Sequence, residues 1–340
     1  MMIRQKTFNY FKASVMPLTR PDYHDIAAAA DRIAPFAQRT PVLSSPHIDA
    51  MIGGRLLVKA EPLQITGSFK FRGACNAVQM LDDTADCVVA WSSGNHAQAV
   101  AMAARSRGIK AIIVMPSDAP AMKINNTKAL GAEVVLYDRY TESREEIGAE
   151  LAKTHGAAVI PPYDFAPVIA GQGTIGKEIA EQTKAMAVTP DQVICCTGGG
   201  GLLAGLCLGL HHHFPDLPIY GAEPVGFDDF SRSLEAGDRL GNDPDARSIC
   251  DAIVTNMPGE ITFAINQDHV TKGLVVSDDE VLDAMAMAWA HLKLVVEPGG
   301  AVALAAALSG KINTAGKTTV VVASGGNVDH AIYKQALARL

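Results

Sequence analysis

Short apolar runs alternate with longer segments of helical periodicity along most of the chain. The runs typical of strands are RLLVKA (55–60), CVVAWSS (87–93), AIIVMP (111–116), AEVVLYD (132–138), QVICC (192–196) and TTVVVA (318–323). Each precedes a segment typical of a helix: 68–81, 95–108, 121–131, 142–156, 202–210 and 329–340. Apolar strands that are each followed by a helix form parallel sheets covered on both faces, so the pattern predicts an α/β fold with parallel-rich sheets flanked by helices.

The same pattern suggests two domains. No linker of low complexity divides the 340 residues, and no repeat is visible. Compact strand–helix units lie within 87–164. We therefore predict a small domain at 87–164 inserted into a large domain made of 1–86 and 165–340.

Charge and composition exclude some classes of function. The formal net charge is −7 and no run of Lys or Arg stands out, so nucleic acid is not an expected partner.

No apolar stretch approaches the roughly 20 residues of a membrane span, and residues 1–20 lack the apolar core of a signal peptide. We expect a cytoplasmic protein. The basic, acid-free start is weakly typical of a transit peptide, but an overlong start before Met16 or a frayed terminus is preferred. The six cysteines lack C-x-x-C pairs and are predicted to be reduced core residues.

The run TGGGGLLAG (197–205) follows an apolar strand and opens a predicted helix. Each glycine in regular structure costs about 1 kcal/mol relative to alanine, so stability does not explain four in succession. They suit backbone amides that approach an anion at the positive end of a helix, and we expect a phosphate cradle; a turn without a ligand is the alternative. The spacing matches neither G-x-x-x-x-G-K-[ST] nor a dinucleotide fingerprint, which indicates a different phosphate-bearing cofactor.

Two further loops, SSGNHAQ (92–98) and ASGGNVD (323–329), lie at predicted strand ends. Open α/β sheets bind ligands outside the carboxyl ends of their strands, so the three loops are expected to share one crevice. Taken singly, each Ser-Gly-Asn segment would more often be only a turn.

Lys70 lies between two phenylalanines in GSFKFRG. On its own, such a lysine is usually a surface cation whose stem covers apolar neighbours.

Taken together and in order, GSFKFRGACNAV, SSGNHAQAVA, IAGQGTIGKEI, TGGGGLLAG and ASGGNVD resemble the motifs of fold-type II pyridoxal-phosphate (PLP) enzymes. Within that group, the chain is most similar to the threonine/serine dehydratase (ammonia-lyase) and serine racemase family, over about residues 20–335. The resemblance implies a two-domain fold like that of the tryptophan synthase β chain, with cofactor and substrate in the cleft between the domains. It also implies a homo-oligomer, most commonly a dimer.

By this resemblance, Lys70 forms a Schiff base with PLP and later acts as a base, for which burial that lowers the pKa of an amine is suited. Phe69 is implied to pack against the pyridine ring and Asn95 to bond its 3′-oxygen. Ser324 is implied to face the pyridine nitrogen, where a neutral serine makes a weaker electron sink than an aspartate and favours prompt loss of a β-leaving group. The implied phosphate loop consists of Gly198, Gly199, Gly200, Gly201 and Leu202.

The implied reaction is β-elimination, a dehydration with deamination. Lys70 removes the Cα proton of a small L-β-hydroxy amino acid, the hydroxyl leaves with a proton supplied through the cofactor phosphate, and a 2-oxo acid and ammonia are released. The residues implied to hold the substrate carboxylate are Ser93, Asn95 and His96, and Ser92 is a further implied substrate-binding residue. Ser93 also matches the serine that reprotonates the opposite face in racemases, so serine racemisation stays open.

An acidic pair follows the glycine loop in GAEPVGFDDF (221–230). Two acids in a loop are most often a solvated surface. By the resemblance, however, Glu223, the carbonyl of Phe227 and Asp229 form a divalent cation site completed by waters. Oxygen ligands of this kind suit Mg2+ or, less tightly, Ca2+ or Mn2+. The run HHHF (211–214) is expected to be a polar helix end.

Substrate choice is the least determined property. In related racemases the position of Arg144 lies near the distal end of the substrate pocket, where a guanidinium would pair with a second carboxylate; pairing with Glu145 or Glu146 is the alternative. CDAIVTNMPGEITF (250–263) is expected to line the pocket with Thr255 and Asn256, but departs from the family's usual Ala-Asp-Gly. We rank L-threonine and L-serine first, 3-hydroxyaspartate a close second and serine racemisation third.

Two other classes of function compete with this interpretation. A nucleotide-dependent oxidoreductase would need the fingerprint that is missing. A non-catalytic amino-acid-binding module would be expected to lose Lys70 or the glycine loop, and both are present. The chain stops soon after SGGNVD, so we expect no C-terminal regulatory domain and prefer a catabolic or housekeeping role.

Overall fold

The computed structural model describes residues 20–340, except for positions 93 and 120. The larger of its two sheets has the strand order β1-β2-β10-β7-β8-β9, with β1 antiparallel to β2 and every other pair parallel. The bounds are β1 Val42–Leu43, β2 Arg55–Ala60, β7 Gln192–Cys196, β8 Ile219–Pro224, β9 Lys272–Val276 and β10 Thr318–Ala323. The expected α/β architecture with parallel-rich sheets is confirmed.

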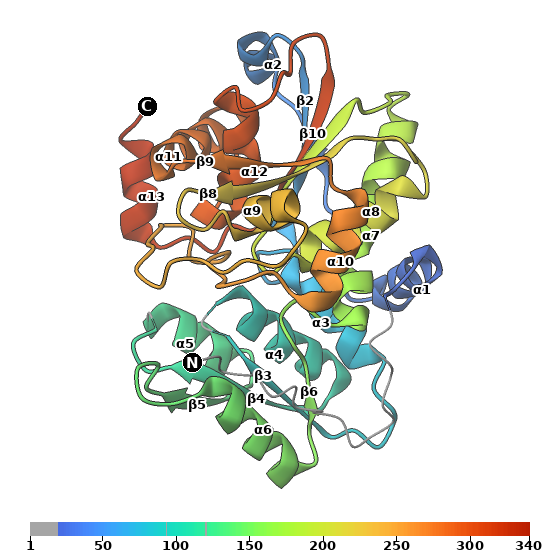
Figure 1. Ribbon diagram of the computed structural model, residues 1–340. Coiled ribbons are helices and arrows are strands. Elements are labelled where there is room, and N and C mark those ends of the chain that lie inside the picture. The colour runs from blue at the N-terminus through green and yellow to red at the C-terminus, as the bar shows by residue number, and fades with distance from the viewer. Residues whose placement is uncertain (1–19, 93, 120) are drawn as a thin grey trace.

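The smaller sheet has the order β5-β4-β3-β6 and is parallel throughout. Its strands are β3 Cys87–Trp91, β4 Lys110–Pro116, β5 Glu133–Tyr137 and β6 Ala158–Val159. All four lie inside the segment predicted to be the small domain, and Figure 1 shows them below the larger sheet. The domain boundaries themselves stay a prediction.

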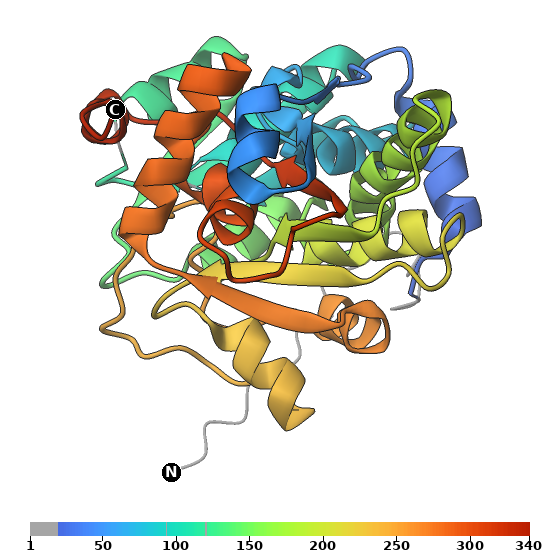
Figure 2. The same ribbon diagram turned by 90° about the horizontal axis from the view of Figure 1, so that it is seen from above.

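Helices cover both sheets, as Figure 1 and the view from above in Figure 2 show. Those of the N-terminal half are α1 Tyr23–Ile33, α2 Pro46–Ile52, the 3-10 helix η1 Glu61–Leu63, α3 Lys70–Gln79, α4 Asn95–Arg107, α5 Ala121–Ala129 and α6 Arg144–His155. Those that follow are α7 Ala166–Ala185, α8 Gly201–His211, α9 Asp229–Ala236, α10 Glu260–His269, α11 Asp278–Met287, the π-helix η2 Ala288–Leu292, α12 Pro298–Leu308 and α13 His330–Leu337. The apolar helix α12 is buried against β10, β7 and β8.

Glycines let α7 approach its neighbours closely enough to fix the start of α8. A Cβ at Gly205 of α8 would lie 2.4 Å from the carbonyl oxygen of Ile169, and one at Gly209 would lie 2.6 Å from that of Gly173. On another face of α7, a Cβ at Gly171 would lie 2.6 Å from Gly73 of α3. Because none of these three contacts leaves room for a methyl group, α7 holds α3 and α8 in one rigid group. The GQG motif is therefore structural, and it sets the two helix N-termini on which the site is built.

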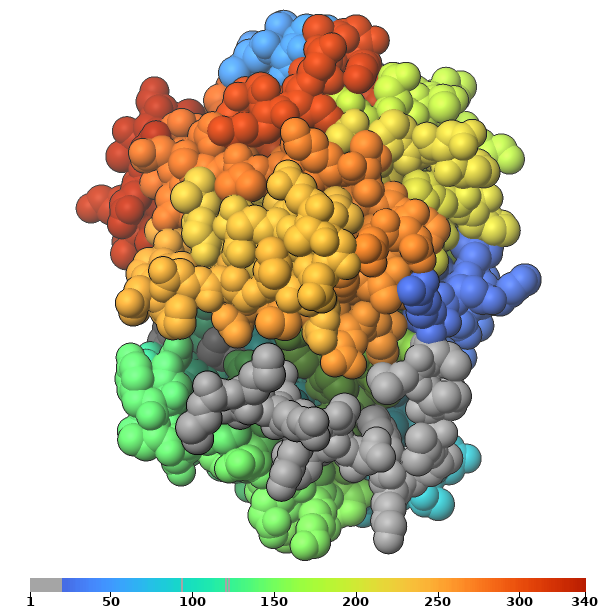
Figure 3. Space-filling model, viewed as in Figure 1, coloured from blue at the N-terminus to red at the C-terminus, as the bar shows by residue number. Residues whose placement is uncertain are grey.

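Further predictions from the sequence concern the cysteines, the histidine run and membrane-spanning helices. The six cysteines are all buried and free, as predicted for reduced core residues. The histidine run begins at the last residue of α8, so it is a helix end, as expected. No helix in the part of the chain described here is long and apolar enough to cross a membrane. Below, the smaller sheet with its helices is called the small body, and the larger sheet with its helices is called the large body. The space-filling view in Figure 3 shows the green segments of the small body facing the yellow and orange segments of the large body.

Candidate active site

Lys70 is the first residue of α3, immediately after Phe69. Its Nζ donates a hydrogen bond to the carbonyl oxygen of Pro162 at 2.8 Å and lies 5.1 Å from the centroid of the Phe69 ring. Burial of the amine lowers its pKa from 10.5 to about 8, against the opposing effects of Cys196 and Glu297. Lys70 is thus not a solvated surface cation. A substantial fraction is the neutral amine near pH 8, which is the nucleophilic form.

The glycine loop forms a cradle of unpaired amides at the N-terminus of α8. Gly200 adopts a φ of +91°, a left-handed conformation that favours glycine. The loop's carbonyl groups are turned outward: Thr262 Oγ1 donates to Gly199 O at 2.6 Å, and Asn266 Nδ2 donates to Gly200 O at 3.2 Å. Among the described residues, no acceptor lies opposite the amides of 198–202. Free amides at a helix start bind an anionic oxygen group such as a phosphate.

Close contacts explain why the cradle needs glycine. A Cβ at Gly198 would lie 2.7 Å from the carbonyl oxygen of Ile253, and one at Gly199 would lie 2.5 Å from the ring of Tyr163. Any side chain at these positions would therefore displace the loop or the tyrosine. Tyr163 follows the carbonyl that binds Lys70, so it joins the lysine to the cradle. Sequence reasoning missed Tyr163 because a tyrosine in a loop carries no signal by itself.

Asn95 begins α4 and connects both bodies of the molecule. Its Nδ2 donates to Oε1 of Glu297 at 2.6 Å, and its Oδ1 accepts from Asn327 Nδ2 at 2.8 Å. Glu297 is buried, and burial followed by repulsion from Asp251 raises its pKa to about 7. Sequence reasoning also missed Glu297, although an acid directly before the apolar segment PGGAVALAAAL was visible. These contacts place the loop of 92–98 against the loop of 323–329, as the strand-end argument expected.

His96 is buried in the second position of α4. Its Nε2 lies 2.8 Å from the carbonyl oxygen of Ile160, which can only accept, so Nε2 carries the proton. Burial, together with the nearby Lys70, lowers the pKa of His96 to about 3. The neutral ring has Nδ1 as a buried acceptor without a partner among the described atoms. An acceptor repels a carboxylate, so only the backbone amide of His96 fits the expected role of holding one.

Ser324 directly follows β10 and is buried next to the lysine segment. Its carbonyl oxygen accepts from the amide of Phe69 at 2.9 Å, and its hydroxyl oxygen accepts from the thiol of Cys196 at 3.2 Å. Cys196 is the last residue of β7, directly before the cradle segment. Phe69 itself belongs to the hydrophobic core of the larger sheet. The residues implied for the cofactor are therefore brought together from the ends of β7 and β10 and the starts of α3, α4 and α8.

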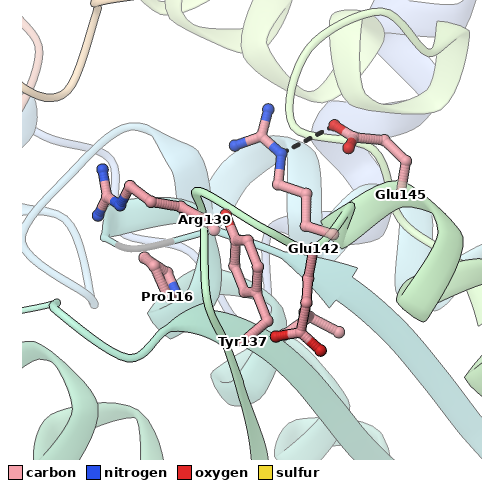
Figure 4. Close-up of a pocket in the computed structure, with 8 residues that line it drawn as sticks. Pro116, Tyr137, Arg139, Glu142 and Glu145 are labelled. Carbon is pink, nitrogen blue, oxygen red and sulfur yellow. Dashed lines mark hydrogen bonds and ion pairs between the residues drawn. The ribbon is translucent and has the colours of Figure 1, made fainter.

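The remaining substrate candidates, apart from Asn95 and His96, divide into three groups. Ser92 and Arg144 line one cavity of about 340 Å³ at the carboxyl ends of β3, β4 and β5, together with Val114, Pro116, Tyr137, Arg139, Glu142 and Glu145 (Figure 4). Thr255 lies on the loop whose Ile253 carbonyl abuts the cradle, with its hydroxyl oxygen buried. Ser93 lies outside the described residues, so its two expected roles stay predictions.

Arg144 makes only part of its potential contacts. Its Nε donates to Oε1 of Glu145 at 2.8 Å, the dashed contact in Figure 4, while its two terminal nitrogens have no acceptor among the described residues. Arg139, on the same cavity, is instead bound through Nε and Nη2 to Asp118. The pairing of Arg144 with Glu145 that the sequence allowed is present. It leaves the guanidinium's end free for a second acid.

The acidic pair lies beside the cradle. Both carboxylate oxygens of Glu223 accept hydrogen bonds from backbone amides of α9, one from Phe230 at 3.0 Å and one from Ser231 at 2.9 Å. Asp229 accepts from Asn242 Nδ2 at 2.6 Å, and its Oδ2 is buried without a partner. Burial raises the pKa of both acids, with repulsion from Asp229 adding to the effect on Glu223. Among residues 20–340, apart from 93 and 120, no group of three or more His, Cys, Asp or Glu side chains is placed to hold a metal ion.

A family model described as pyridoxal-phosphate dependent enzyme matches residues 33–325. The chain belongs to this family. Curated relatives include an L-threo-3-hydroxyaspartate ammonia-lyase of a Pseudomonas species, 44% identical over 93% of this chain and 98% of that protein, and a serine racemase of Schizosaccharomyces pombe, 40% identical over 95% and 99%. Among solved structures, a threonine deaminase from T.th. has a TM-score of 0.86 at 44% identity, covering 91% of this chain and 99% of that one. Maize serine racemase has a TM-score of 0.87 at 40% identity, covering 94% and 98%.

The site of this fold-type II PLP enzyme fits its cofactor on structural grounds. The cradle offers unpaired amides for the phosphate, and Lys70 offers a desolvated amine. Buried polar atoms without partners cluster on the same loops, namely Thr66 Oγ1, Ser68 Oγ, His96 Nδ1 and Thr197 Oγ1. Unsatisfied buried polar atoms are costly, so their concentration here indicates a place for a polar ligand.

Proposed function

We propose that this protein is a PLP-dependent ammonia-lyase that dehydrates and deaminates a small L-β-hydroxy amino acid, with 3-hydroxyaspartate as the preferred substrate. The products are oxaloacetate and ammonia. The observation that carries the choice of substrate is the free end of Arg144 in the cavity that it shares with Ser92. Relatives from Pseudomonas and Saccharomyces cerevisiae with the name L-threo-3-hydroxyaspartate ammonia-lyase support it.

The roles of the chain's own residues follow from their positions. PLP, when bound, supplies an electron sink that acidifies the Cα–H bond. Lys70 then holds or removes the Cα proton, because its lowered pKa allows it to be neutral near pH 8. The amides at the start of α4 receive the α-carboxylate, and Arg144 receives the distal one through its two terminal nitrogens. The neutral His96 ring keeps a second positive charge away from Lys70.

The acidic pair is proposed to hold Mg2+, or Ca2+ or Mn2+, through Glu223, the carbonyl of Phe227 and Asp229. The unpaired, buried Asp229 Oδ2 next to a second buried carboxyl group supports it, because two such acids are expensive to ionise together without a cation. Tyr163, which covers the cradle, is close enough to Asp229 for their charges to interact. The ion would therefore support the cradle rather than the reacting carbon.

L-Threonine and L-serine, ranked first from the sequence, remain the second candidate. The contact that favours them is the ion pair between Arg144 and Glu145, which neutralises part of the charge that a second carboxylate would need. The similar T.th. structure, which carries the name threonine deaminase, supports the same substrates. Serine racemisation rests on Ser93, which lies outside the described residues. The dimer and the cytoplasmic location likewise stay predictions.

The decisive experiment compares release of 2-oxo acids from L-threonine, L-serine and the threo and erythro 3-hydroxyaspartates, with PLP and Mg2+ added. We expect oxaloacetate to dominate. Arg144→Gln should raise the KM for 3-hydroxyaspartate by about 10- to 100-fold, the value of a charged hydrogen-bonded pair, while kcat/KM for L-serine changes little. Arg139→Gln is the matched control, because its guanidinium lines the same cavity but is already bound to Asp118. Equal losses on both substrates in Arg144→Gln would make that residue structural.

A further inference from the structure

One ion pair, close to the start of α4, joins the part of the molecule built on the smaller sheet to the part built on the larger sheet. Lys123 Nζ, on α5 of the small body, lies 2.5 Å from Oδ2 of Asp251, on the loop that follows α9 in the large body. Figure 1 shows α5 facing the loops of that region. Lys123 lies outside the motifs described above, and Asp251 lies in the segment 250–263 that is expected to line the pocket. Their contact joins α5 to the loop between α9 and α10.

The ammonium group lies beside the proposed carboxylate-binding segment. A Cβ built at Gly94 would have Lys123 Nζ as its neighbour at 3.9 Å. Gly94 is the N-cap of the 13-residue helix α4, and among the described residues the amides of Asn95, His96 and Ala97 donate no hydrogen bond. The charge of Lys123 also influences the carboxyl group of Glu297, which binds Asn95. The Lys123 ammonium group, paired only with Asp251, thus lies beside amides that have no partner among the described residues.

The two partners of this ion pair differ in their exposure. The Lys123 side chain is 13% exposed, whereas that of Asp251 is 57% exposed. Asp251 can therefore move into water at little cost, while Lys123 loses its principal acceptor if Asp251 leaves and nothing replaces it. An arriving carboxylate would be such a replacement. This asymmetry distinguishes the pair from an ordinary surface salt bridge.

We infer that Lys123 is a substrate-binding residue that receives the α-carboxylate, and that Asp251 occupies its place until the substrate displaces it. This inference rests on the proposed function, since it assumes that the cleft takes a carboxylate. It extends that proposal by naming a second cation and a built-in competitor. Because every amino-acid substrate has an α-carboxylate, Lys123 contributes to affinity for all of them, whereas Arg144 contributes only for dicarboxylates.

The test compares Lys123→Met with Asp251→Asn, because the two variants should change KM in opposite directions. Lys123→Met should raise the KM for both L-serine and 3-hydroxyaspartate by about 10- to 100-fold, the loss of one charged hydrogen bond. Asp251→Asn should instead lower both KM values by about two- to fivefold, because a partly exposed competitor of modest strength is removed. Lys123→Arg should restore most of the affinity. Lys110→Met and Glu133→Gln, which break an exposed ion pair between β4 and β5, are the controls and should leave KM unchanged.

Binding of succinate to the PLP-loaded enzyme, measured by calorimetry, separates this inference from the proposed function. Succinate has the four-carbon dicarboxylate skeleton of 3-hydroxyaspartate but cannot react. If no hydroxy amino acid is turned over, the proposed function fails, while the succinate Kd still tests Lys123. Weaker binding in Lys123→Met together with tighter binding in Asp251→Asn supports the inference. Losses in both variants, or no change in either, would overturn it and leave the pair with a purely structural role.

Discussion

Asn95 Nδ2 donates a hydrogen bond of 2.6 Å to Oε1 of Glu297, a residue 202 positions further along the chain. The bond joins the start of α4, beside the smaller sheet, to the N-cap of α12, which is buried against the larger one. A second bond from Asn327 fixes the other end of the Asn95 amide. The amide therefore has a defined orientation before any ligand arrives, and an acid that the sequence analysis overlooked is responsible for it.

The first prediction concerns the charge state of Glu297. Its folded-state pKa is raised from 4.5 to about 7, so the folded protein binds this proton more tightly than the unfolded chain does. Stability from this group is thus present below pH 4.5 and is lost as the pH rises from 4.5 to about 7, by about 3 kcal/mol in total. Glu297→Gln removes the loss while its side-chain oxygen can still accept from Asn95. The apo form of Glu297→Gln should be more stable than wild type at pH 8, but not at pH 4.5.

Urea unfolding of both apoproteins across this pH range provides the measurement. The gain in unfolding free energy should grow between pH 4.5 and pH 7 and then level off. Glu150→Gln, at an exposed position of α6, serves as the control and should show no such gain. A Glu297→Gln protein that is less stable at every pH would show that the ionised carboxylate, not the neutral acid, stabilises the fold.

The second prediction concerns Lys70. Its pKa of about 8 means that the fraction of neutral amine rises with pH through that value. The rate at which apoenzyme gains its visible absorption band on mixing with PLP should therefore rise with pH and reach half of its maximum near pH 8. Borohydride should abolish the visible band of the wild type and leave a pyridoxyl group attached to it through denaturing gel filtration, whereas Lys70→Ala should retain no attached pyridoxyl group. A midpoint near 10.5 would contradict the burial of this amine.

Much of the architecture could be predicted from local pattern. The runs at 55–60, 192–196 and 318–323 are strands with those bounds, because short, mostly apolar runs suit a doubly covered parallel sheet. Helix α3 begins at Lys70 rather than at residue 68, since Ser68 instead bridges to Gly325. That contact spans most of the chain, and nothing in the local sequence around Ser68 indicates it.

The site shows the same division between local and distant information. Glycines and a lysine in characteristic motifs could be identified because the backbone conformation and chemistry they serve are encoded within a few residues. Glu297 and Tyr163 could not, because their roles depend on burial and on contacts with distant loops. Asp251 and Lys123 are likewise ordinary charged residues in the sequence. Only the apposition of two bodies makes their pairing meaningful.

The third prediction concerns Gly200. It separates the effect of the cradle's geometry on PLP affinity from the general cost of a positive φ. Gly200→Ala places a Cβ about 2.9 Å from Thr262 Oγ1 and forces alanine into a φ of +91°. We expect PLP affinity to fall by at least about tenfold, because strain of about 1–2 kcal/mol is relieved by moving the amides that bind the phosphate. Gly108→Ala is the control: its φ is +75°, but nothing lies within 4 Å of the new methyl group. It should lose stability while the Kd for PLP, measured by absorption titration, stays unchanged.

The fourth prediction concerns a buried network two residues beyond Lys70. Arg72 donates to Glu61 from Nε at 2.9 Å and to Glu178 from Nη1 at 2.7 Å, and Lys59 Nζ lies 2.5 Å from the same Glu178. The two cations balance two acids, so removal of one leaves a buried charge without compensation. Arg72→Met should lower the unfolding free energy by about 3–5 kcal/mol.

Denaturant unfolding of Arg72→Met beside Arg39→Met checks this value. Arg39 pairs with Glu181 at the surface, where the side chains are 54% and 40% exposed, and its loss should change stability by less than about 1 kcal/mol. Similar small effects for both variants would mean that water enters the network once Arg72 is shortened.

The last prediction tests the acidic pair through stability rather than activity. Without a cation, Asp229 and Glu223 are two buried acids that repel each other, and Asp229→Asn keeps the acceptor for Asn242 while removing one charge. In EDTA, this variant should therefore be at least as stable as wild type. Binding of Mg2+ only to the folded state stabilises by about 2.7 kcal/mol at a concentration of 100 times Kd, so added Mg2+ should raise the Tm of wild type by several degrees and that of Asp229→Asn hardly at all. Asp243→Asn, an exposed acid on the neighbouring loop, should respond to Mg2+ as wild type does. The same Mg2+ response in all three proteins would place the ion elsewhere, because only the Asp229 variant lacks a proposed ligand.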